Sequence, residues 1–238
     1  MANKTLLVVP CYNEERRLNF AEFEKWASED LQFLFFDDGS TDETASLISQ
    51  YIENRPFMYF EKGVKNLGKA EAVRSGVLTA KNLPVYGRLD WIGFWDADLA
   101  TPLFEVSNMF TYADFCKQPV DAVFGSRVFR LGARIERLPY RHYLARVFAT
   151  LVSVMLGVRS YDSQCGAKLF KKSVAERAFS KHFVSRWIFD VEILLRLDQS
   201  RIVEYPLTRW VDVAGSKLRP KDVITVFTDI LRIWRKKS

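Results

Sequence analysis

Two aspartates close together in this sequence could bind a metal ion. Asp96 and Asp98 are separated by one alanine and follow an apolar segment, residues 91–95. Two carboxylates at this spacing can approach one hard cation, and Mg²⁺ or Mn²⁺ held in this way usually bridges phosphate oxygens. The alternative is a turn at the end of a strand that carries two solvated acids. The pair alone leaves both interpretations open.

A second acidic group, residues 37–42, also allows two interpretations. Asp, Gly and Ser suit a tight turn, and Ser40 or Thr41 suits a helix cap. Paired carboxylates at the carboxyl end of a strand also suit hydrogen bonds to a ribose or a base. Further along, Lys69 follows Gly68 at the start of a predicted helix, where backbone amides and a positive charge favour phosphate.

Six arginines lie between residues 127 and 146, accompanied by a single acid, Glu136. They are Arg127, Arg130, Arg134, Arg137, Arg141 and Arg146. Arginine binds phosphate with a planar fork of donors, although such a run is also typical of a solvated helix face. An apolar segment, residues 147–158, follows directly. This order fits a helix on a membrane surface, and a core helix with a basic approach is the alternative.

The composition is that of a globular protein whose charge is divided unevenly. The chain has 238 residues, of which 48% are hydrophobic and 27% charged, so it can bury a sizeable core and is not a disordered chain. Residues 1–119 contain 12 Lys and Arg against 18 Asp and Glu, whereas residues 120–238 contain 23 against 11. The basic half predicts an anionic partner, and no nucleic-acid-binding module is recognised.

Cysteine content and hydropathy bear on the compartment. The three cysteines are too few and too scattered for a disulfide framework or a zinc site, which favours a reducing compartment. The longest nearly uncharged apolar stretch, residues 147–158, is too short for a bilayer, which takes about 20 residues. We therefore expect no transmembrane helix and no secretion signal.

Short apolar segments alternate with helical patterns through the first half. Strands are predicted at residues 5–9, 33–36, 57–60, 91–95 and 122–124, and helices at 14–28, 42–54, 68–80 and from Pro102. This alternation predicts an α/β fold with a mainly parallel sheet and helices on both faces. Ligands then bind beyond the carboxyl ends of the strands, where residues 11–15, 37–42 and 96–98 would converge. Later helices are predicted at 140–157, 184–196 and 222–237, with a strand at 202–211 interrupted by Pro206.

Several motifs, taken together, resemble the inverting family 2 glycosyltransferases, which have the GT-A fold of nucleotide-diphospho-sugar transferases. The motifs of the first half are VVPCYNEE (8–15), DDGSTDET (37–44), KNLGKAEAVRSG (65–76), DADLATP (96–102) and GSR (125–127). Those of the second half are DSQCGAKLF (162–170), RWIFDVEIL (186–194) and AGSKL (214–218), and they resemble the branch that acts on polyprenyl phosphates. This branch includes the dolichyl-phosphate β-glucosyltransferases and mannose synthases. The resemblance covers nearly the whole chain.

The resemblance implies a donor site for a nucleotide sugar and a divalent cation, Mg²⁺ or Mn²⁺. Asp96 and Asp98 would be the metal ligands, and Lys217 would close over the diphosphate. The donor-binding residues would be Pro10, Tyr12, Glu14, Phe36, Asp38, Lys69, Asp96, Ala97, Asp98 and Lys217. Two departures from the mannose synthases, Ala100 where they have Gln and Val211 where they have Arg, weaken a mannose assignment.

The resemblance also implies an acceptor site and a reaction. Arg127 and Arg141 would bind the acceptor phosphate, and Arg127 would also neutralise charge during transfer. Asp98, Arg127 and Asp190 would be the catalytic residues, with Asp190 orienting first and acting as a base second, and Glu192 in reserve. The implied reaction transfers a hexose, glucose from UDP-glucose, to polyprenyl or dolichyl phosphate with inversion. A phosphate monoester is already anionic near neutral pH and needs little help from a base.

The implied protein is one GT-A domain, residues 1–238, with a donor half up to residue 125 and an acceptor half from residue 126. We expect it to be cytoplasmic and peripheral on the cytoplasmic face of a membrane, alone or with a membrane-protein partner. The alternatives are a GDP-mannose-dependent enzyme, a family 2 enzyme with a non-lipid acceptor, and a non-catalytic scaffold. A nucleotidyltransferase is disfavoured because residues 10–14 do not form its Gly-rich signature.

Overall fold

The computed structural model describes residues 3–213 and 220–237 of the chain. These residues form two compact units. The first unit is the chain up to Leu99 together with residues 166–182, and the second is the remainder. The expectation of a single domain divided at residue 125 stays a prediction.

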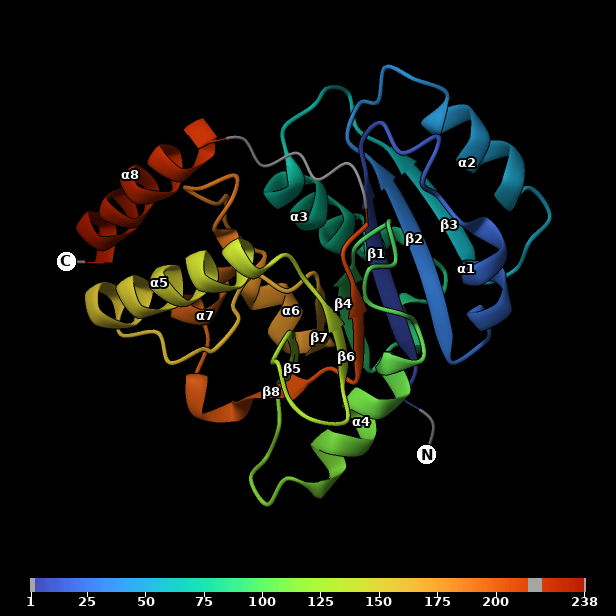
Figure 1. Ribbon diagram of the computed structural model, residues 1–238. Helices are drawn as coiled ribbons and strands as arrows, with labels where there is room; N and C mark the ends of the chain where they lie inside the picture. The colour runs from blue at the N-terminus through green and yellow to red at the C-terminus, as the bar shows by residue number, and fades with distance from the viewer. Residues whose placement is uncertain (1–2, 214–219, 238) are drawn as a thin grey trace. The chain divides into compact units, whose positions relative to one another are not determined.

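The first unit is built on a mainly parallel sheet, as the sequence predicts. Strands β1 (Thr5–Cys11), β2 (Leu31–Asp37), β3 (Met58–Lys62) and β4 (Trp91–Trp95) run parallel in the order β3-β2-β1-β4, and β7 (Ala167–Lys171) pairs antiparallel with β4 (Figure 1). Apart from the edge strand β3, these strands are almost fully buried, because a parallel sheet is covered on both faces.

Helices cover both faces of this sheet, because alternate strand residues point to opposite sides. Phe23 of α1 (Phe20–Trp26) packs edge-on against Phe33 and Phe35 of β2. Gly76 of α3 (Lys69–Thr79) packs on the other face, where an added Cβ would lie 2.4 Å from Val8. Helices α2 (Thr44–Ile52) and α6 (Lys172–Ala178) complete the unit, with short 3-10 turns at Ala80–Asn82 and Tyr86–Arg88.

Two predictions for the start of the chain are wrong. Strand β1 does not stop before Pro10 but continues to Cys11, with Pro10 paired to Phe36. Its pairing with β4 reaches only Val8, so the proline lies where β1 has one strand neighbour in the described pairings and a missing N–H is tolerated. The helix expected from residue 14 begins only at Phe20, because the preceding residues form turns fixed by later side chains.

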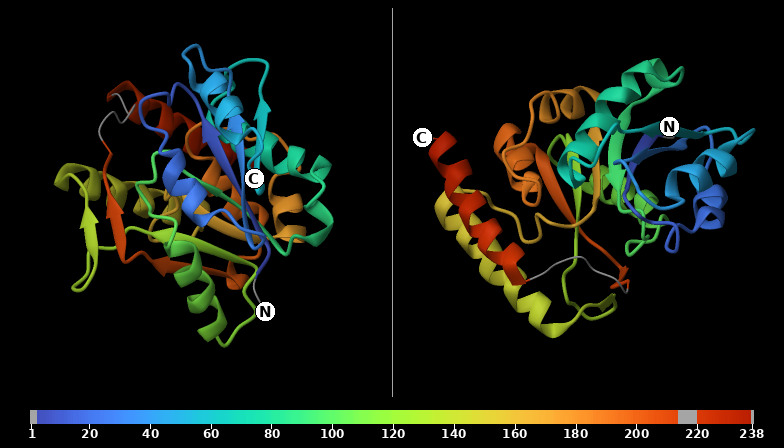
Figure 2. Two further views of the ribbon diagram at one scale, coloured as in Figure 1. Left: turned by 90° about the vertical axis from the view of Figure 1, so that its right-hand side faces the viewer. Right: turned by 90° about the horizontal axis from the view of Figure 1, so that it is seen from above.

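The second unit contains two parallel strand pairs and the longest helices. Strand β5 (Ala122–Ser126) pairs with β8 (Ile202–Pro206), and β6 (Arg134–Glu136) pairs with β9 (Arg209–Val211). The helices are α4 (Glu105–Phe115), α5 (Pro139–Leu156), α7 (Phe189–Arg196) and α8 (Pro220–Lys237), with a 3-10 turn at Gln199–Arg201. Helices α5 and α8 lie side by side (Figures 1 and 2).

Tertiary hydrogen bonds decide where elements of this unit end. The helix expected from residue 184 begins only at Phe189, because the amides of Val184 and Ser185 bind the carboxylate of Glu192 instead of a helical carbonyl. The strand expected at residues 202–211 is interrupted after Pro206, as predicted. There the buried carboxylate of Glu105 accepts hydrogen bonds from the amides of Thr208 and Arg209. None of the described helices is long and apolar enough to cross a membrane.

Candidate active site

The loops after β1 and β2 are joined by side-chain hydrogen bonds. Asn13 adopts a left-handed conformation (φ 53°), in which its amide donates to the hydroxyl of Ser40 and its side-chain oxygen accepts from the amide of Thr41, both at 2.9 Å. The amide of Glu14 donates to the hydroxyl of Thr44 at 2.8 Å. These hydrogen bonds fix the segment that carries Tyr12 and Glu14, two of the predicted donor-binding residues.

The acids after β2 organise the same edge of the sheet. The carboxylate of Asp37 accepts from the amide of Ser40, which is the turn interpretation of this motif. Asp38 is 4% exposed, and its two carboxylate oxygens accept from the amides of Leu67 at 2.9 Å and Gly68 at 2.7 Å. Asp38 therefore fixes the entry to α3. Its contact with a ribose stays a prediction.

The sequence prediction places Asp96 and Asp98 at a strand end, and the structure confirms that position. They follow β4 directly, and a turn from the Leu99 amide to the Asp96 carbonyl holds the loop. The ammonium of Lys69, at the first residue of α3, lies 2.5 Å from Asp96 Oδ1. Sequence spacing did not predict this pairing, since the two residues are 27 positions apart and meet only through the parallel sheet.

A glycine makes room for the Asp96 carboxylate. The amide of Asp96 donates to the carbonyl of Gly166 at 3.0 Å, and an added Cβ on Gly166 would lie 1.9 Å from Asp96 Oδ2. Any side chain at position 166 would therefore displace the carboxylate. Gly166 belongs to the DSQCGAKLF motif, but sequence reasoning gave it no role.

The donor set at this edge fits a hard divalent cation bound together with phosphate. Asp96 and Asp98 supply carboxylate oxygens, the Asp96 side chain is 35% exposed, and the Lys69 ammonium shows that a cation can lie against it. Within the described residues, no group of three or more His, Cys, Asp or Glu side chains could hold a metal ion. A cation here would draw its remaining ligands from water and phosphate, as Mg²⁺ commonly does.

In the second unit, Arg127 is held by a buried acid. Its backbone amide, Nε and Nη2 donate to the carboxylate of Asp162 at 3.0, 2.6 and 2.7 Å, and its guanidinium lies 5.3 Å from the Trp210 ring centroid. Burial by itself would raise the pKa of the Asp162 carboxyl, but the Arg127 guanidinium outweighs it and holds that pKa well below its ordinary value. Sequence reasoning missed Asp162, although it opens the DSQCGAKLF motif.

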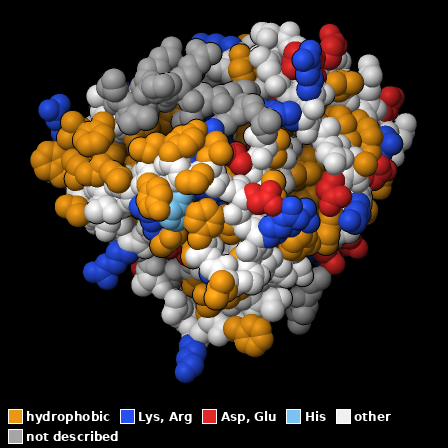
Figure 3. Space-filling model, viewed as in Figure 1, with side chains coloured by type: hydrophobic (Ala, Val, Ile, Leu, Met, Phe, Trp, Pro, Cys, Tyr) orange, Lys and Arg blue, Asp and Glu red, His pale blue; other side chains and the backbone are white. Residues whose placement is uncertain are grey.

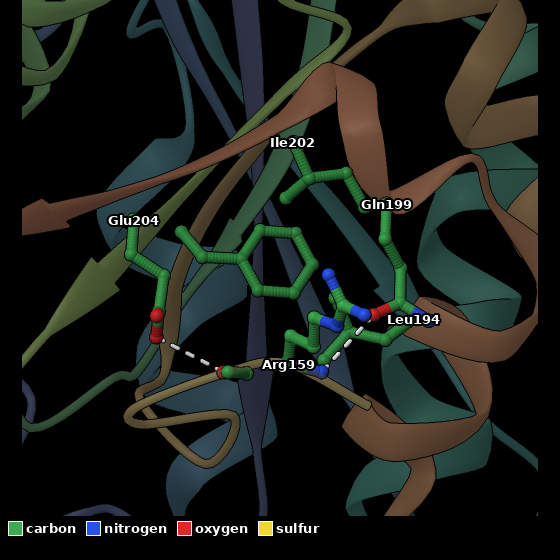
Figure 4. A pocket seen from close by; sticks show the side chains of 7 residues that line it. Arg159, Leu194, Gln199, Ile202 and Glu204 are labelled. Carbon is green, nitrogen blue, oxygen red and sulfur yellow. Dashed lines mark hydrogen bonds between the residues drawn. The ribbon is translucent and has the colours of Figure 1, made fainter. Parts of the chain in front are cut away.

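The loop that carries Asp162 is itself fixed by β8. One carboxylate of Glu204 accepts from the Ser160 hydroxyl and from the amides of Tyr161 and Asp162, at 2.7–2.9 Å. Figure 4 shows Glu204 beside a small cavity of about 90 Å³, on whose other side the Arg159 amide donates to Gln199. Glu204 thus positions Arg127 through Asp162.

The other predicted acceptor arginine is also paired. Arg141 Nη1 donates to both carboxylate oxygens of Asp212, at 3.1 and 2.8 Å. The Asp212 amide in turn donates to the carbonyl of Glu136, the last residue of β6. Arg141 is therefore fixed at the start of α5 by a residue 71 positions away, which no local pattern could indicate.

Helix α7 presents two acids in its first turn. Asp190 is 5% exposed and Glu192 is 6% exposed. Burial raises the pKa of the Glu192 carboxyl, and its oxygens accept from the amides of Val184 and Ser185 at 2.9–3.1 Å. Glu192 therefore has a clear structural role in ordering the segment before α7, and the orienting role of Asp190 stays a prediction.

The predicted residues divide between the two units. The donor-binding residues from Pro10 to Asp98 all belong to the first unit, whereas Arg127, Arg141 and Asp190 belong to the second. Lys217 lies outside the described residues.

Comparisons with known proteins identify the family of the chain and several of its relatives. The model of the family "Glycosyl transferase family 2" matches residues 6–179. A dolichyl-phosphate beta-glucosyltransferase of Trichomonas vaginalis is 32% identical over 96% of this chain and 70% of its own, and the Homo sapiens protein of that name is 32% identical over 90% and 69%.

A solved structure is similar in fold. Glucosyl-3-phosphoglycerate synthase from Mycobacterium tuberculosis, in complex with Mn²⁺, UDP and glucosyl-3-phosphoglycerate, superposes with a TM-score of 0.65 over 97% of this chain and 79% of its own, at 18% identity. This likeness confirms the predicted GT-A fold, and the family match confirms the resemblance drawn from the motifs. The chain belongs to glycosyltransferase family 2.

Proposed function

We propose that this protein transfers glucose from UDP-glucose to the phosphate of dolichyl phosphate or a similar polyprenyl phosphate, with inversion at the anomeric carbon. The observation that carries the proposal is that one unit has an acidic strand-end site, Asp96 with Lys69, and the other unit has an arginine-rich cluster around Arg127 and Arg141. Two relatives at 32% identity are named dolichyl-phosphate beta-glucosyltransferases, which supports the glucosyl group and the dolichyl phosphate acceptor. A GDP-mannose donor is the second candidate, disfavoured by Ala100 and Val211.

The donor half of the proposal rests on charge. UDP-glucose carries a diphosphate, and Asp96 and Asp98 would hold Mg²⁺ or Mn²⁺ against it, as their oxygen donors allow. The bound cation would supply charge neutralisation for the departing UDP. Lys69 adds a positive charge beside Asp96, so it would bind the diphosphate once the cation competes for that carboxylate. Tyr12, Phe36 and Asp38 would contact the nucleoside.

The acceptor half requires a phosphate anion to approach a negatively charged donor. Arg127 and Arg141 would bind the acceptor phosphate, and both guanidinium groups are oriented in advance by their aspartates. Prior orientation lowers the cost of ordering these long side chains. The phosphate oxygen would then attack the anomeric carbon from the face opposite the departing UDP, which forms the new C–O bond as the old one breaks. Asp190 would orient the sugar or the acceptor.

A lipid acceptor also requires a membrane surface. Helices α5 and α8 expose apolar side chains at three- and four-residue steps, and Figure 3 shows hydrophobic side chains gathered over both helices. The exposed set is Tyr140, Tyr143, Leu144, Val147 and Val154 on α5, and Phe227, Leu231 and Trp234 on α8. We propose that this apolar surface lies against the bilayer, with the exposed Arg235 and Lys236 near anionic headgroups.

Part of each helix packs within the protein instead. Ile230 and Ile233 of α8 are almost fully buried, and Phe148, Leu151 and Met155 of α5 are half-buried. Ile230 and Ile233 therefore pack within the protein, while Phe227, Leu231 and Trp234 form the exposed stripe of α8.

Nucleotide binding tests the donor assignment. Thermal unfolding is measured with UDP, GDP and CDP, each with Mn²⁺, because a ligand that binds only the folded state raises its melting temperature. We expect UDP to give the largest increase, and the increase to disappear in Asp98→Asn. A larger increase with GDP would support the mannose donor and contradict the proposal.

A further inference from the structure

Two arginines of the proposed acceptor site, Arg127 after β5 and Arg141 in α5, are each already paired with an acid. Arg127 makes three hydrogen bonds to Asp162, and Arg141 makes two to Asp212. Pairs of this kind fix a guanidinium in place, but they also occupy its best donors. An incoming phosphate would have to compete with a carboxylate at each of them.

Arg137 interacts electrostatically with Arg127 and Arg141, but unlike them it is not paired with an acid among the described residues. It follows β6 and precedes Pro139, the first residue of α5. The side chain is half-buried, and within the described part of the chain its guanidinium makes no hydrogen bond and no ion pair. Burial, with the positive charges of Arg127 and Arg141, lowers the pKa of Arg137 to about 10, so the group is still cationic at neutral pH.

The cluster therefore holds more positive than negative charge. Arg127, Arg137 and Arg141 contribute three positive charges, and the facing acids Asp162 and Asp212 contribute two negative ones. No described residue binds the N–H donors of this half-buried cation, so a ligand can take them. A guanidinium presents five N–H donors, and the ligand that fits them is an anion with several acceptor oxygens.

The position of Arg137 indicates which anion. The residues that follow it, Leu138 and Tyr140, are 49% and 58% exposed and begin the apolar surface of α5. A ligand at this point would have its anionic end among the arginines and apolar contacts directly beside it. A phosphate monoester on a hydrocarbon chain has this form, whereas a nucleoside diphosphate does not.

We propose that Arg137 is the residue that binds the phosphate of the lipid acceptor directly, while Arg127 and Arg141, held by their aspartates, shape and charge the site around it. This proposal rests on the proposed function and changes its detail: the arginine whose donors have no partner among the described residues makes the principal contact. Arg137 is thus a specificity-determining residue for the acceptor and contributes little to the donor.

Kinetics with both substrates test this assignment. Arg137→Gln should raise the KM for polyprenyl phosphate at least about tenfold, as expected for loss of charge-assisted hydrogen bonds, and change the KM for UDP-glucose less than twofold. Arg137→Lys should give a KM for polyprenyl phosphate between those of the wild type and Arg137→Gln, because lysine keeps the positive charge but lacks the planar set of guanidinium donors. Arg134→Gln is the matched control, since Arg134 is exposed on β6 and its ion pair among the described residues is a local one with Glu136.

Stability separates a binding role from a structural one. Because the Arg137 guanidinium has no partner among the described residues, Arg137→Gln should unfold at the same or a higher temperature than the wild type. A melting temperature lowered by more than about 5 °C would overturn the proposal in favour of a structural role. An unchanged acceptor KM in Arg137→Gln would overturn it as well.

A binding experiment keeps this inference distinct from the proposed function. A water-soluble short-chain prenyl phosphate should raise the melting temperature of the wild type and of Arg134→Gln, but not that of Arg137→Gln, and the corresponding prenyl alcohol should raise none. Equal stabilisation of all three proteins by the phosphate would overturn the role of Arg137 and leave the proposed function standing. If the wild type binds the phosphate through Arg137 but transfers no glucose, the inference stands and the proposed function fails.

Discussion

The Lys69 ammonium lies 2.5 Å from a carboxylate oxygen of Asp96, and this ion pair joins the first residue of α3 to the loop after β4. Both groups are partly exposed, so the pair itself adds little to stability. Its importance is electrostatic. It keeps one cation at the carboxylate that we assign to a metal, and it keeps that cation within reach of a diphosphate.

Removing Lys69 should therefore separate metal binding from catalysis. Lys69→Met removes a positive charge that competes with the metal, so we expect Mn²⁺ to bind the free enzyme more tightly. The same change removes a charge that would stabilise departing UDP, so we expect kcat to fall by about tenfold to a hundredfold. Calorimetric titration with Mn²⁺ and steady-state kinetics measure the two effects. Weaker Mn²⁺ binding in Lys69→Met would contradict this account of the pair.

Asp98→Asn should abolish transfer with little change in the fold. The substitution removes one carboxylate from the proposed metal pair while keeping the side-chain size. We expect a loss of at least about a hundredfold in kcat at saturating Mg²⁺ or Mn²⁺. Asp114→Asn, at an exposed position of α4, is the control and should be as active as the wild type. Normal turnover by Asp98→Asn would contradict the assignment of Asp98 as a metal ligand.

The Asp162–Arg127 pair should give a specific dependence of stability on pH. Because the folded-state pKa of Asp162 is lowered, its charged form stabilises the fold above the unfolded pKa of about 3.9, and this contribution is lost as the pH falls further. We expect Asp162→Asn to cost about 3 kcal/mol of unfolding free energy near pH 7, because it leaves Arg127 buried without its charge partner.

Denaturant unfolding of both proteins from pH 3 to pH 7 checks this expectation. The difference in unfolding free energy between wild type and Asp162→Asn should be constant from about pH 5 to pH 7 and should shrink below about pH 4. A difference that stays constant down to pH 3 would mean that the carboxylate charge is not what stabilises this part of the fold.

Membrane attachment should depend on the exposed stripe of α8. We expect the protein to sediment with anionic vesicles, and Phe227→Ser with Trp234→Ser to reduce the bound fraction. Phe115→Ser removes a still more exposed aromatic side chain from the end of α4 and should have no effect. The double variant Arg235→Gln/Lys236→Gln should weaken binding to anionic vesicles by about 1 kcal/mol for each charge removed. Its binding should also depend less on salt. Equal sedimentation of the wild type and the Phe227/Trp234 variant would contradict docking through α8.

Features that depend on neighbouring residues in the sequence were predicted correctly. Apolar segments such as residues 91–95 became buried strands, and the acids that follow them lie at strand ends as expected. The boundaries that failed depend on distant partners. Residues 14–18 are not helical because the amide of Glu14 binds Thr44, thirty positions later, and α7 begins late because Glu192 binds the amides of Val184 and Ser185.

The candidate site was predictable in residue type but not in pairing. Six arginines after β5 indicated a phosphate site, yet nothing in their spacing distinguishes Arg127 and Arg141, which have acidic partners, from Arg137, which has none among the described residues. Their partners Asp162 and Asp212 are 35 and 71 positions away. Side-chain pairing across such distances is set by the fold and cannot be read from local periodicity.

The central claim is tested most directly by following formation of the lipid product. Purified protein is incubated with Mn²⁺, a polyprenyl phosphate in mixed vesicles and either UDP-glucose or GDP-mannose, and the lipid fraction is analysed by mass spectrometry and by NMR of the anomeric proton. The account predicts a polyprenyl phosphate β-glucose formed from UDP-glucose, and none when dolichol replaces dolichyl phosphate. A product formed only from GDP-mannose, or one with the α configuration, would contradict it.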